Sequence, residues 1–256
     1  MMGKSIFLSH GSPMIAVENN EYTRFLAELG ASWTPEFIVI FSAHWESDDL
    51  TISYTNETYE TIYDFYGFPD ELYRVQYPAR GSEQASARLE ELFTASGIQV
   101  QRDTSRGLDH GSWSLLKHMY PQANIPVVQV SVNAYLSAEE QVKIGAALRE
   151  LQHEDVLIIG SGASVHNLRT LKWGQKTAET WALQFDDWLI DKVESKKMND
   201  LFAYQDLAPH ASLAVPRAEH FVPLLIALGS SNPDSKAKVL HRSYDVGTLS
   251  YLCFEF

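Results

Sequence analysis

Three of the nine histidines in the 256 residues follow apolar runs that have the character of buried strands. His10 opens a His-Gly-Ser-Pro turn, His44 lies in Ser-Ala-His-Trp-Glu, and His166 ends Gly-Ser-Gly-Ala-Ser-Val-His. Neutral imidazole is a common metal ligand near physiological pH, and ligands from separate strand ends suit a catalytic metal with open coordination positions. Any one of these histidines alone would more simply be a packing or capping side chain. Three in equivalent positions predict a site for one divalent metal.

Two further segments carry candidate site residues. Glu219 and His220, in Pro-Arg-Ala-Glu-His-Phe-Val-Pro, open an apolar helical run that can aim one of them at the site, although Glu219 could simply complement the helix dipole. His110, in Arg-Gly-Leu-Asp-His-Gly, lies before a helix and could either contact a substrate or belong to a capping segment. The remaining histidines have weaker contexts, and we interpret them as surface or packing residues: His118, His153, His210 and His241.

Alternating strand and helix patterns must position these residues. The predicted strands are Lys4–Ser9, Phe37–Ala43, Ile125–Val132 and Asp155–Gly160, with a last strand at a sheet edge over Leu249–Phe256. The predicted helices cover Tyr22–Leu29, Glu83–Ala95, Trp113–Met119, Ser137–Leu151, Ala178–Val193 and Glu219–Leu228. This alternation predicts a single α/β domain over residues 1–256, with a mostly parallel central sheet flanked by helices. Since ligands of such sheets bind beyond the carboxyl ends of the strands, we expect the active site there.

One long stretch does not follow this alternation. Residues 47–80 contain many aromatic side chains and no clear periodicity. The segment is therefore interpreted as an insertion that covers the site, where its aromatic rings could stack on a substrate or simply pack with one another.

Composition narrows the class of protein. The formal net charge of −13 disfavours non-specific attraction to nucleic acid or to anionic membranes. A single cysteine, Cys253, excludes an intrachain disulfide and favours a reducing compartment. The N-terminal apolar stretch is too short for a signal peptide or a membrane span. We therefore expect a cytoplasmic protein, and a monomer.

Two familiar catalytic patterns are missing. Neither Gly-x-Gly-x-x-Gly after the first strand nor the P-loop pattern occurs, so a nucleotide-phosphate site has no support. The Gly-Ser-Gly-Ala-Ser stretch resembles a nucleophile elbow around Ser161, but the Gly-x-Ser-x-Gly spacing is absent.

Five motifs taken together resemble one family over nearly the whole chain. They are His-Gly-Ser-Pro at 10–13, Ser-Ala-His-Trp at 42–45, Arg-Gly-Leu-Asp-His-Gly at 106–111, Gly-Ser-Gly-x-Ser-x-His-Asn at 160–167 and Glu-His-Phe-x-Pro-Leu at 219–224. In this order they resemble the 4,5-DOPA extradiol dioxygenases, a branch of the class III ring-cleaving dioxygenases. The resemblance implies an enzyme that opens the ring of a catechol with dioxygen to give a muconic semialdehyde.

The resemblance also implies roles for individual residues. A non-haem metal, iron(II) in the active enzyme and often zinc in isolated protein, would be held by His10, His44 and His220. His166 would be the acid/base histidine beside the metal and is a candidate further ligand, while His110 would contact the substrate. Other class III enzymes use two histidines and one carboxylate, which leaves Glu219 as the alternative to His220.

Two other functions remain open at this level. The same histidines could activate water in a zinc hydrolase, although no His-Glu-x-x-His motif occurs. A non-catalytic protein that binds a metal or a partner on the same fold is the second alternative. The loss of a candidate ligand would be its expected signature, and all the candidates are present.

Overall fold

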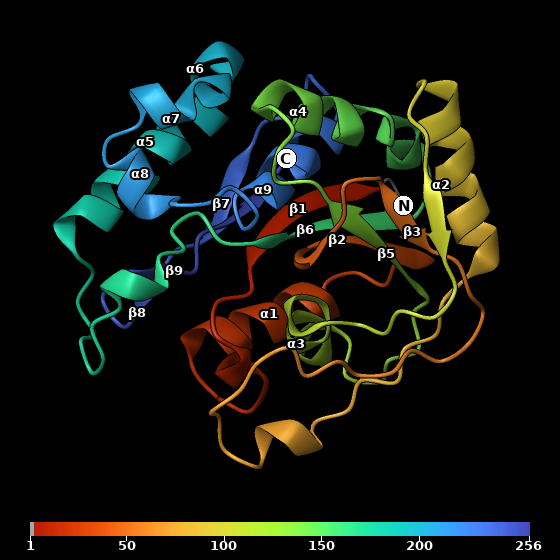
Figure 1. Cartoon of the computed structure of the whole chain (residues 1–256), viewed down its shortest axis with the longest axis horizontal. Coiled ribbons are helices and arrows are strands. Elements are labelled where there is room, and N and C mark those ends of the chain that lie inside the picture. Colours follow the sequence, from red (N-terminus) through yellow and green to blue (C-terminus); the bar gives the residue numbers. More distant parts are fainter. Residues whose placement is uncertain (1–2) are drawn as a thin grey trace.

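The computed structural model describes residues 3–256, which form one large sheet with helices on both faces (Figure 1). Within this range the main sheet has eight strands in the order β4-β3-β5-β2-β6-β1-β10-β7. Its centre, β5-β2-β6-β1, is parallel. The strands of this sheet are β1 (Lys4–Ser9), β2 (Phe37–Glu46), β3 (Thr51–Ser53), β4 (Gln101–Asp103), β5 (Val127–Val132), β6 (Val156–Gly162), β7 (Lys238–His241) and β10 (Cys253–Glu255). The predicted fold class is confirmed.

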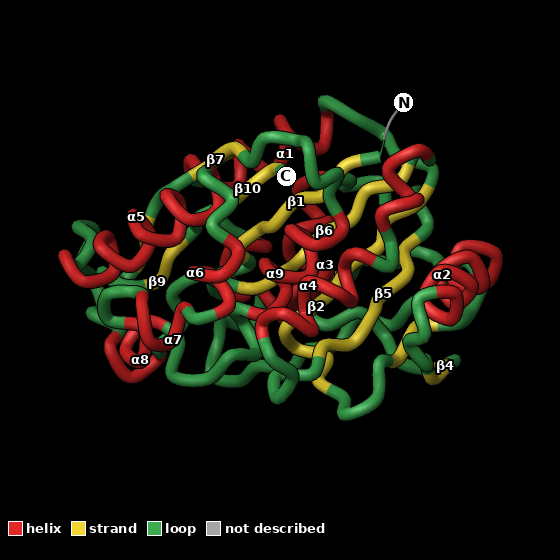
Figure 2. Tube along the Cα trace, turned by 90° about the horizontal axis from the view of Figure 1, so that it is seen from above, coloured by secondary structure: helices red, strands yellow, loops and turns green. Residues whose placement is uncertain are grey.

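The central strands are near-continuous runs of buried residues because helices cover both faces. Figure 1 shows α1 and α3 on one face and α4 and α9 on the other. Seen from above, α2 lies at one end of the molecule and α5 to α8 at the other (Figure 2). The helices are α1 (Glu21–Ala31), α2 (Glu83–Ala95), α3 (His110–Met119), α4 (Ala138–Ala146), α5 (Thr180–Glu194), α6 (Met198–Phe202), α7 (Tyr204–Leu207), α8 (Ala211–Ala214) and α9 (Val222–Ser230). None of the helices within residues 3–256 is long and apolar enough to cross a membrane.

Helix boundaries follow local capping chemistry. Asn20 caps α1 and Ser137 caps α4, each in a reciprocal capping box, which accounts for the predicted starts of both helices. The helix predicted from Glu219 begins only at Val222, where Pro223 occupies the first turn. Glu219 and His220 therefore lie in the turn that leads into α9, not in the helix itself.

The prediction that the last strand lies at an edge was wrong. The segment divides into β9 (Leu249–Ser250), which pairs with β8 (Tyr244–Asp245), and β10, which lies inside the main sheet between β1 and β7. The edge is β7, a short and partly exposed strand without a strong apolar pattern. Because β10 has neighbours on both sides, its backbone is paired and its side chains Cys253 and Phe254 are fully buried.

Glycines on β6 let the α9 end of the chain lie directly against the sheet. A Cβ atom added at Gly160 would come 2.1 Å from the carbonyl oxygen of Pro223, and one at Gly162 would come 2.1 Å from that of His220. These separations are far below van der Waals contact, so only glycine allows the two backbones to approach this closely. The Gly-Ser-Gly run therefore has a packing role, in which bare backbone positions the turn that carries His220.

Candidate metal centre

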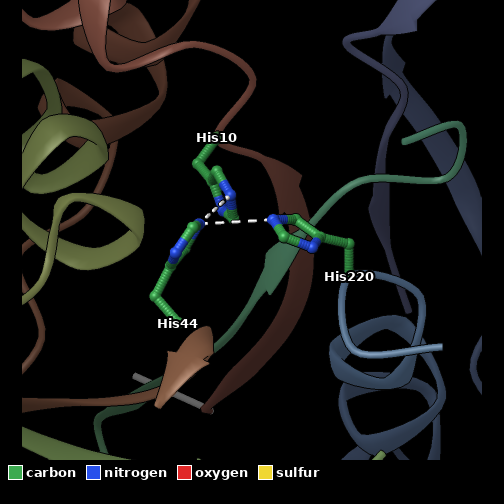
Figure 3. A group of neighbouring side chains, drawn as sticks. All are labelled: His10, His44 and His220. Atoms are coloured by element: carbon green, nitrogen blue, oxygen red, sulfur yellow. Dashed lines mark hydrogen bonds between the residues drawn. The ribbon is translucent and has the colours of Figure 1, made fainter. Parts of the chain in front are cut away.

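Three histidines from separate parts of the chain meet at the carboxyl end of the sheet (Figure 3). His10 follows β1, His44 lies near the end of β2, and His220 lies in the turn before α9. Nε2 of His44 is 3.0 Å from Nε2 of His10 and 3.2 Å from Nε2 of His220. His10 and His220 are buried, and the side chain of His44 is 21 % exposed. The three imidazoles therefore face one another across a small, mostly enclosed space.

The opposite nitrogen of each ring has an acceptor. Nδ1 of His44 is 3.1 Å from a carboxylate oxygen of Asp64, and Nδ1 of His220 is 3.1 Å from one of Glu219. Nδ1 of His10 is 2.9 Å from the hydroxyl oxygen of Ser161, whose own proton goes to a backbone carbonyl. An ionised carboxylate only accepts hydrogen bonds, so each Nδ1 that faces one carries the proton in the neutral ring. The three Nε2 lone pairs consequently point at one another.

This donor set fits a cation. Lone pairs about 3 Å apart repel unless a positive charge lies between them. Two nitrogens that each lie about 2.1 Å from one metal, at roughly right angles, are separated by about 3 Å. Burial, together with the charge of the neighbouring histidines, lowers the pKa of His10 and of His220 well below the ordinary value, which keeps both rings in the neutral form that a metal requires.

Glu219 contacts Nδ1 of His220, on the side of the ring that faces away from the other two histidines. Its Oε1 faces Nδ1 of His220, while its Oε2 is 3.8 Å from the Arg217 guanidinium. Arg217 in turn pairs with Glu46, at 2.7 Å for one of the two contacts. Burial raises the pKa of Glu219. A carboxylate behind a ligating imidazole is the usual arrangement for orienting that imidazole, so the geometry favours His220 over Glu219 as the third donor.

His166 lies against His220 on the side of α8. The two rings are stacked with their centroids 3.5 Å apart and an angle of 10° between their planes. The backbone N–H of His166 donates to the carbonyl of Ala214, which fixes the loop after β6. Burial lowers the pKa of His166 to about 4, and the neighbouring histidines add to this effect. The ring of His166 is therefore neutral near pH 7 and lies next to the three converging imidazoles.

His110 is the first residue of α3, where Asp109 caps the helix. Its ring centroid is 4.0 Å from that of His44 and 5.4 Å from that of His10, so it completes the wall of the cluster. A Cβ atom at Gly111 would meet Ser42 Oγ at 2.7 Å and the ring of His44 at 3.0 Å. Glycine at this position lets α3 approach the histidines, and helix α3 thereby brings His110 to the site.

The structure thus brings all the sequence-predicted site residues into one region. His44 lies inside β2 because that strand continues to Glu46 instead of ending at Ala43, and its pairing with β5 is irregular between Phe41 and Glu46. His118 and His241 are packing residues: His118 contacts the carbonyl of Ile15, and the ring of His241 stacks on that of Phe25.

Sequence reasoning missed Asp64. This residue lies between Tyr63 and Phe65 in the aromatic segment and contacts both His44 and His110. No periodicity surrounds it, and only its place directly between two aromatic residues could have drawn attention to it. The segment that was predicted to cover the site therefore also contributes a polar contact to it.

Comparison with known proteins identifies the family. Residues 4–253 match the family described as the catalytic LigB subunit of aromatic ring-opening dioxygenase. Proteins named 4,5-DOPA dioxygenase extradiol are similar over nearly their whole length. The one from Beta vulgaris is 38 % identical, covering 99 % of this chain and 96 % of its own, and the one from Escherichia coli K12 is 36 % identical, covering 97 % and 92 %. A crystal structure of an uncharacterized protein from Escherichia coli K12 superimposes with a TM-score of 0.85 at 33 % identity, covering both chains fully.

The chain therefore belongs to the aromatic ring-opening dioxygenases of this LigB type. Within that class it is an extradiol dioxygenase, a non-haem metal enzyme that uses dioxygen and a small-molecule substrate. The predicted family and enzyme class are confirmed. The alternatives of a zinc hydrolase and of a non-catalytic binding protein are not retained.

Proposed function

We propose that this enzyme cleaves the aromatic ring of a DOPA-like catechol beside its diol, giving a muconic semialdehyde that carries both atoms of dioxygen. The observation that carries the proposal is the convergence of three Nε2 lone pairs whose Nδ1 positions are already engaged. The relatives named 4,5-DOPA dioxygenase extradiol support the choice of substrate class. The whole chain, residues 1–256, would form the single catalytic domain, and a cytoplasmic monomer stays the expectation.

In this proposal His10, His44 and His220 hold the metal. Iron(II) is the proposed metal of the active enzyme, and zinc is expected in isolated protein. When bound, iron(II) would orient the diol and dioxygen together and pass electrons between them. Glu219 is assigned the role of orienting His220, since its carboxylate occupies the far side of that ring. The two nearby carboxylates, Asp64 and Glu219, would also offset part of the charge of a divalent ion.

His166 is the proposed acid/base residue. A catechol must lose protons as it binds, and a neutral imidazole beside the three ligands can accept one at a free ring nitrogen. The same proton is then available to an oxygen atom as the O–O bond breaks and the ring opens, so the histidine ends the cycle as it began. His166 is also a candidate further ligand, because one of its ring nitrogens lies within 4.8 Å of a ring nitrogen of His220.

His110 is the proposed substrate contact. Its Nδ1 faces Asp64, which leaves Nε2 as an acceptor for a substrate hydroxyl. The ring of Phe65 lies edge-on to His110, with centroids 5.6 Å apart, and Trp113 packs behind Phe65 at 6.2 Å. These aromatic side chains supply an apolar wall that can exclude water from the ring of a catechol.

Oxygen uptake by protein loaded anaerobically with iron(II) tests the proposal. L-DOPA and a panel of smaller catechols are added, and zinc-loaded protein serves as the control. We expect uptake that needs iron and a coloured ring-opened product, with the panel ranking the substituents. A filled metal site without uptake on any catechol would reject the proposed substrate class.

A further inference from the structure

Asp64, in the aromatic segment, contacts two histidines of the site through its carboxylate. One carboxylate oxygen, Oδ2, is 3.1 Å from Nδ1 of His44. The other, Oδ1, is 2.8 Å from Nδ1 of His110 and 3.1 Å from the backbone N–H of the same residue. The residue lies at the surface, yet its side chain is only 23 % exposed. A single carboxylate therefore joins a proposed metal ligand to the proposed substrate contact.

The contact with His44 determines which nitrogen of that ring carries the proton. An ionised carboxylate offers only lone pairs, so Nδ1 of His44 must donate and Nε2 must present its own lone pair. A metal needs that lone pair, and its loss would remove one donor in three.

The contact with His110 likewise determines which nitrogen of the His110 ring carries the proton. Oδ1 accepts two hydrogen bonds from His110, one from the ring and one from the backbone, which fixes both the rotamer and the start of α3. Nε2 of His110 is then an acceptor that faces away from Asp64. A catechol hydroxyl is a donor of the matching kind.

We infer that Asp64 is a positioning residue that fixes two histidines at once, directing Nε2 of His44 to the metal and Nε2 of His110 to the substrate hydroxyl. The part that concerns the substrate rests on the proposed function, whereas the part that concerns the metal rests on the three-histidine geometry alone. Since Asp64 belongs to residues 47–80, this segment also determines which ring nitrogens of His44 and His110 face the metal and the substrate.

The neighbours of Asp64 explain how an irregular segment can hold it in place. Tyr63 and Phe65, on either side of it, pack against the buried Trp113 with ring centroids 6.1 and 6.2 Å away. Trp113 itself donates to the carbonyl of Ile62, and Tyr63 donates to that of Val75. The aromatic packing therefore fixes the backbone on both sides of the carboxylate, as an oriented hydrogen bond to a metal ligand requires.

The variant Asp64→Asn separates the two contacts. The amide keeps one acceptor oxygen and gains an N–H₂ group, and the oxygen should stay with His110, which brings two donors. The N–H₂ group then faces Nδ1 of His44 and forces the proton of that ring onto Nε2, where a metal would bind. We expect zinc affinity, measured by chelator competition, to fall 10- to 100-fold, the usual effect of losing such a partner. Catechol binding to zinc-saturated protein, measured by calorimetry, should be retained.

The variant Asp64→Ala removes both contacts, so both affinities should fall. The exposed carboxylate Asp70 in the same segment provides the matched control, and Asp70→Asn should change neither. Metal-free Asp64→Asn should melt close to the metal-free wild type, which separates positioning from a general loss of stability. Cobalt(II) substitution adds a visible spectrum that reports the ligand set without turnover.

Each outcome decides something. Wild-type zinc affinity in Asp64→Asn would overturn the inference for His44, whatever the enzyme does to catechols. Wild-type catechol binding in Asp64→Ala would overturn it for His110. If wild-type protein binds zinc but no catechol at all, the proposed substrate class fails, and the inference about His44 still stands or falls on the zinc measurement.

Discussion

The sheet rim and the segment 47–80 meet at the same cluster of histidines, but they hold their residues by different means. On the rim, which is the carboxyl end of the sheet, strand pairing fixes the positions of His10 and His44. The backbone N–H of His10 still donates to the carbonyl of Gly162 on β6. In the segment, Asp64 depends on aromatic packing around Trp113 and on two isolated bridges, Thr58 with Arg80 and Thr61 with Leu108. The rim supplies donors whose positions the fold dictates, whereas the segment supplies orientation and cover.

If this division is correct, the largest effect should come from removing a rim donor. His44→Ala takes away one of three converging Nε2 atoms, so the metal content per chain should fall from near one to near zero. The loss of affinity should exceed the 100-fold upper range for an orienting partner. Elemental analysis after dialysis measures it. His210→Ala is the control, since the side chain of His210 hydrogen-bonds to Gln184 and not to a residue of the cluster, and equal metal in both variants would contradict the division.

His166→Ala should have the next largest effect, on turnover and not on metal. Removal of a positioned acid/base group costs about 10²- to 10⁴-fold in rate. The melting temperature and metal content should stay near those of the wild type, because the three converging donors remain. Steady-state oxygen consumption by iron-loaded protein gives the rate. Full turnover in this variant would remove His166 from the proposed acid/base role.

Gly162→Ala tests whether bare backbone on β6 positions His220. The new Cβ would press on the carbonyl of His220 at 2.1 Å, and such overpacking costs about 1–3 kcal/mol of unfolding free energy. Denaturant unfolding measures the cost, and zinc affinity should fall with it. Gly160→Ala presses on Pro223 instead and should cost similar stability while keeping more of the zinc affinity. If both variants lost the same zinc affinity, this explanation would be wrong.

The smallest effect belongs to the aromatic side chains of the segment. Phe65→Leu removes a ring that lies beside His110 and Trp113, so KM for a catechol should rise roughly 2- to 10-fold, corresponding to the 0.5–1.5 kcal/mol of an aromatic contact. The metal content should not change. Tyr66→Leu is the matched control, because Tyr66 is the neighbour of Phe65 in the sequence but is 92 % exposed. A loss of metal in Phe65→Leu would show that the segment does more than orient and cover.

The same division explains what could be predicted from the sequence. Strand ends are visible as apolar runs that stop, so His10 and His44 could be found by their position alone. Asp64 could not, because its partners are more than 15 positions away and nothing periodic surrounds it. The start of α9 could have been placed from Pro223, since proline favours the first turn of a helix. The inner position of β10 could not, because β7 beyond it has too little apolar character to be recognised.

The separation of His10 and His220 along the chain has a consequence for protein lifetime. A metal bound between them would join β1 to the turn before α9, in a chain whose single cysteine provides no covalent staple. Binding to the folded state alone adds RT ln(1 + [M]/Kd), or about 4.1 kcal/mol when the free metal is 1,000 times Kd. Proteases that cut transiently opened chains would then remove metal-starved molecules first. The proposed catalytic metal would thus also stabilise the folded chain reversibly. Resistance to proteolysis would then report how much of the protein has metal bound.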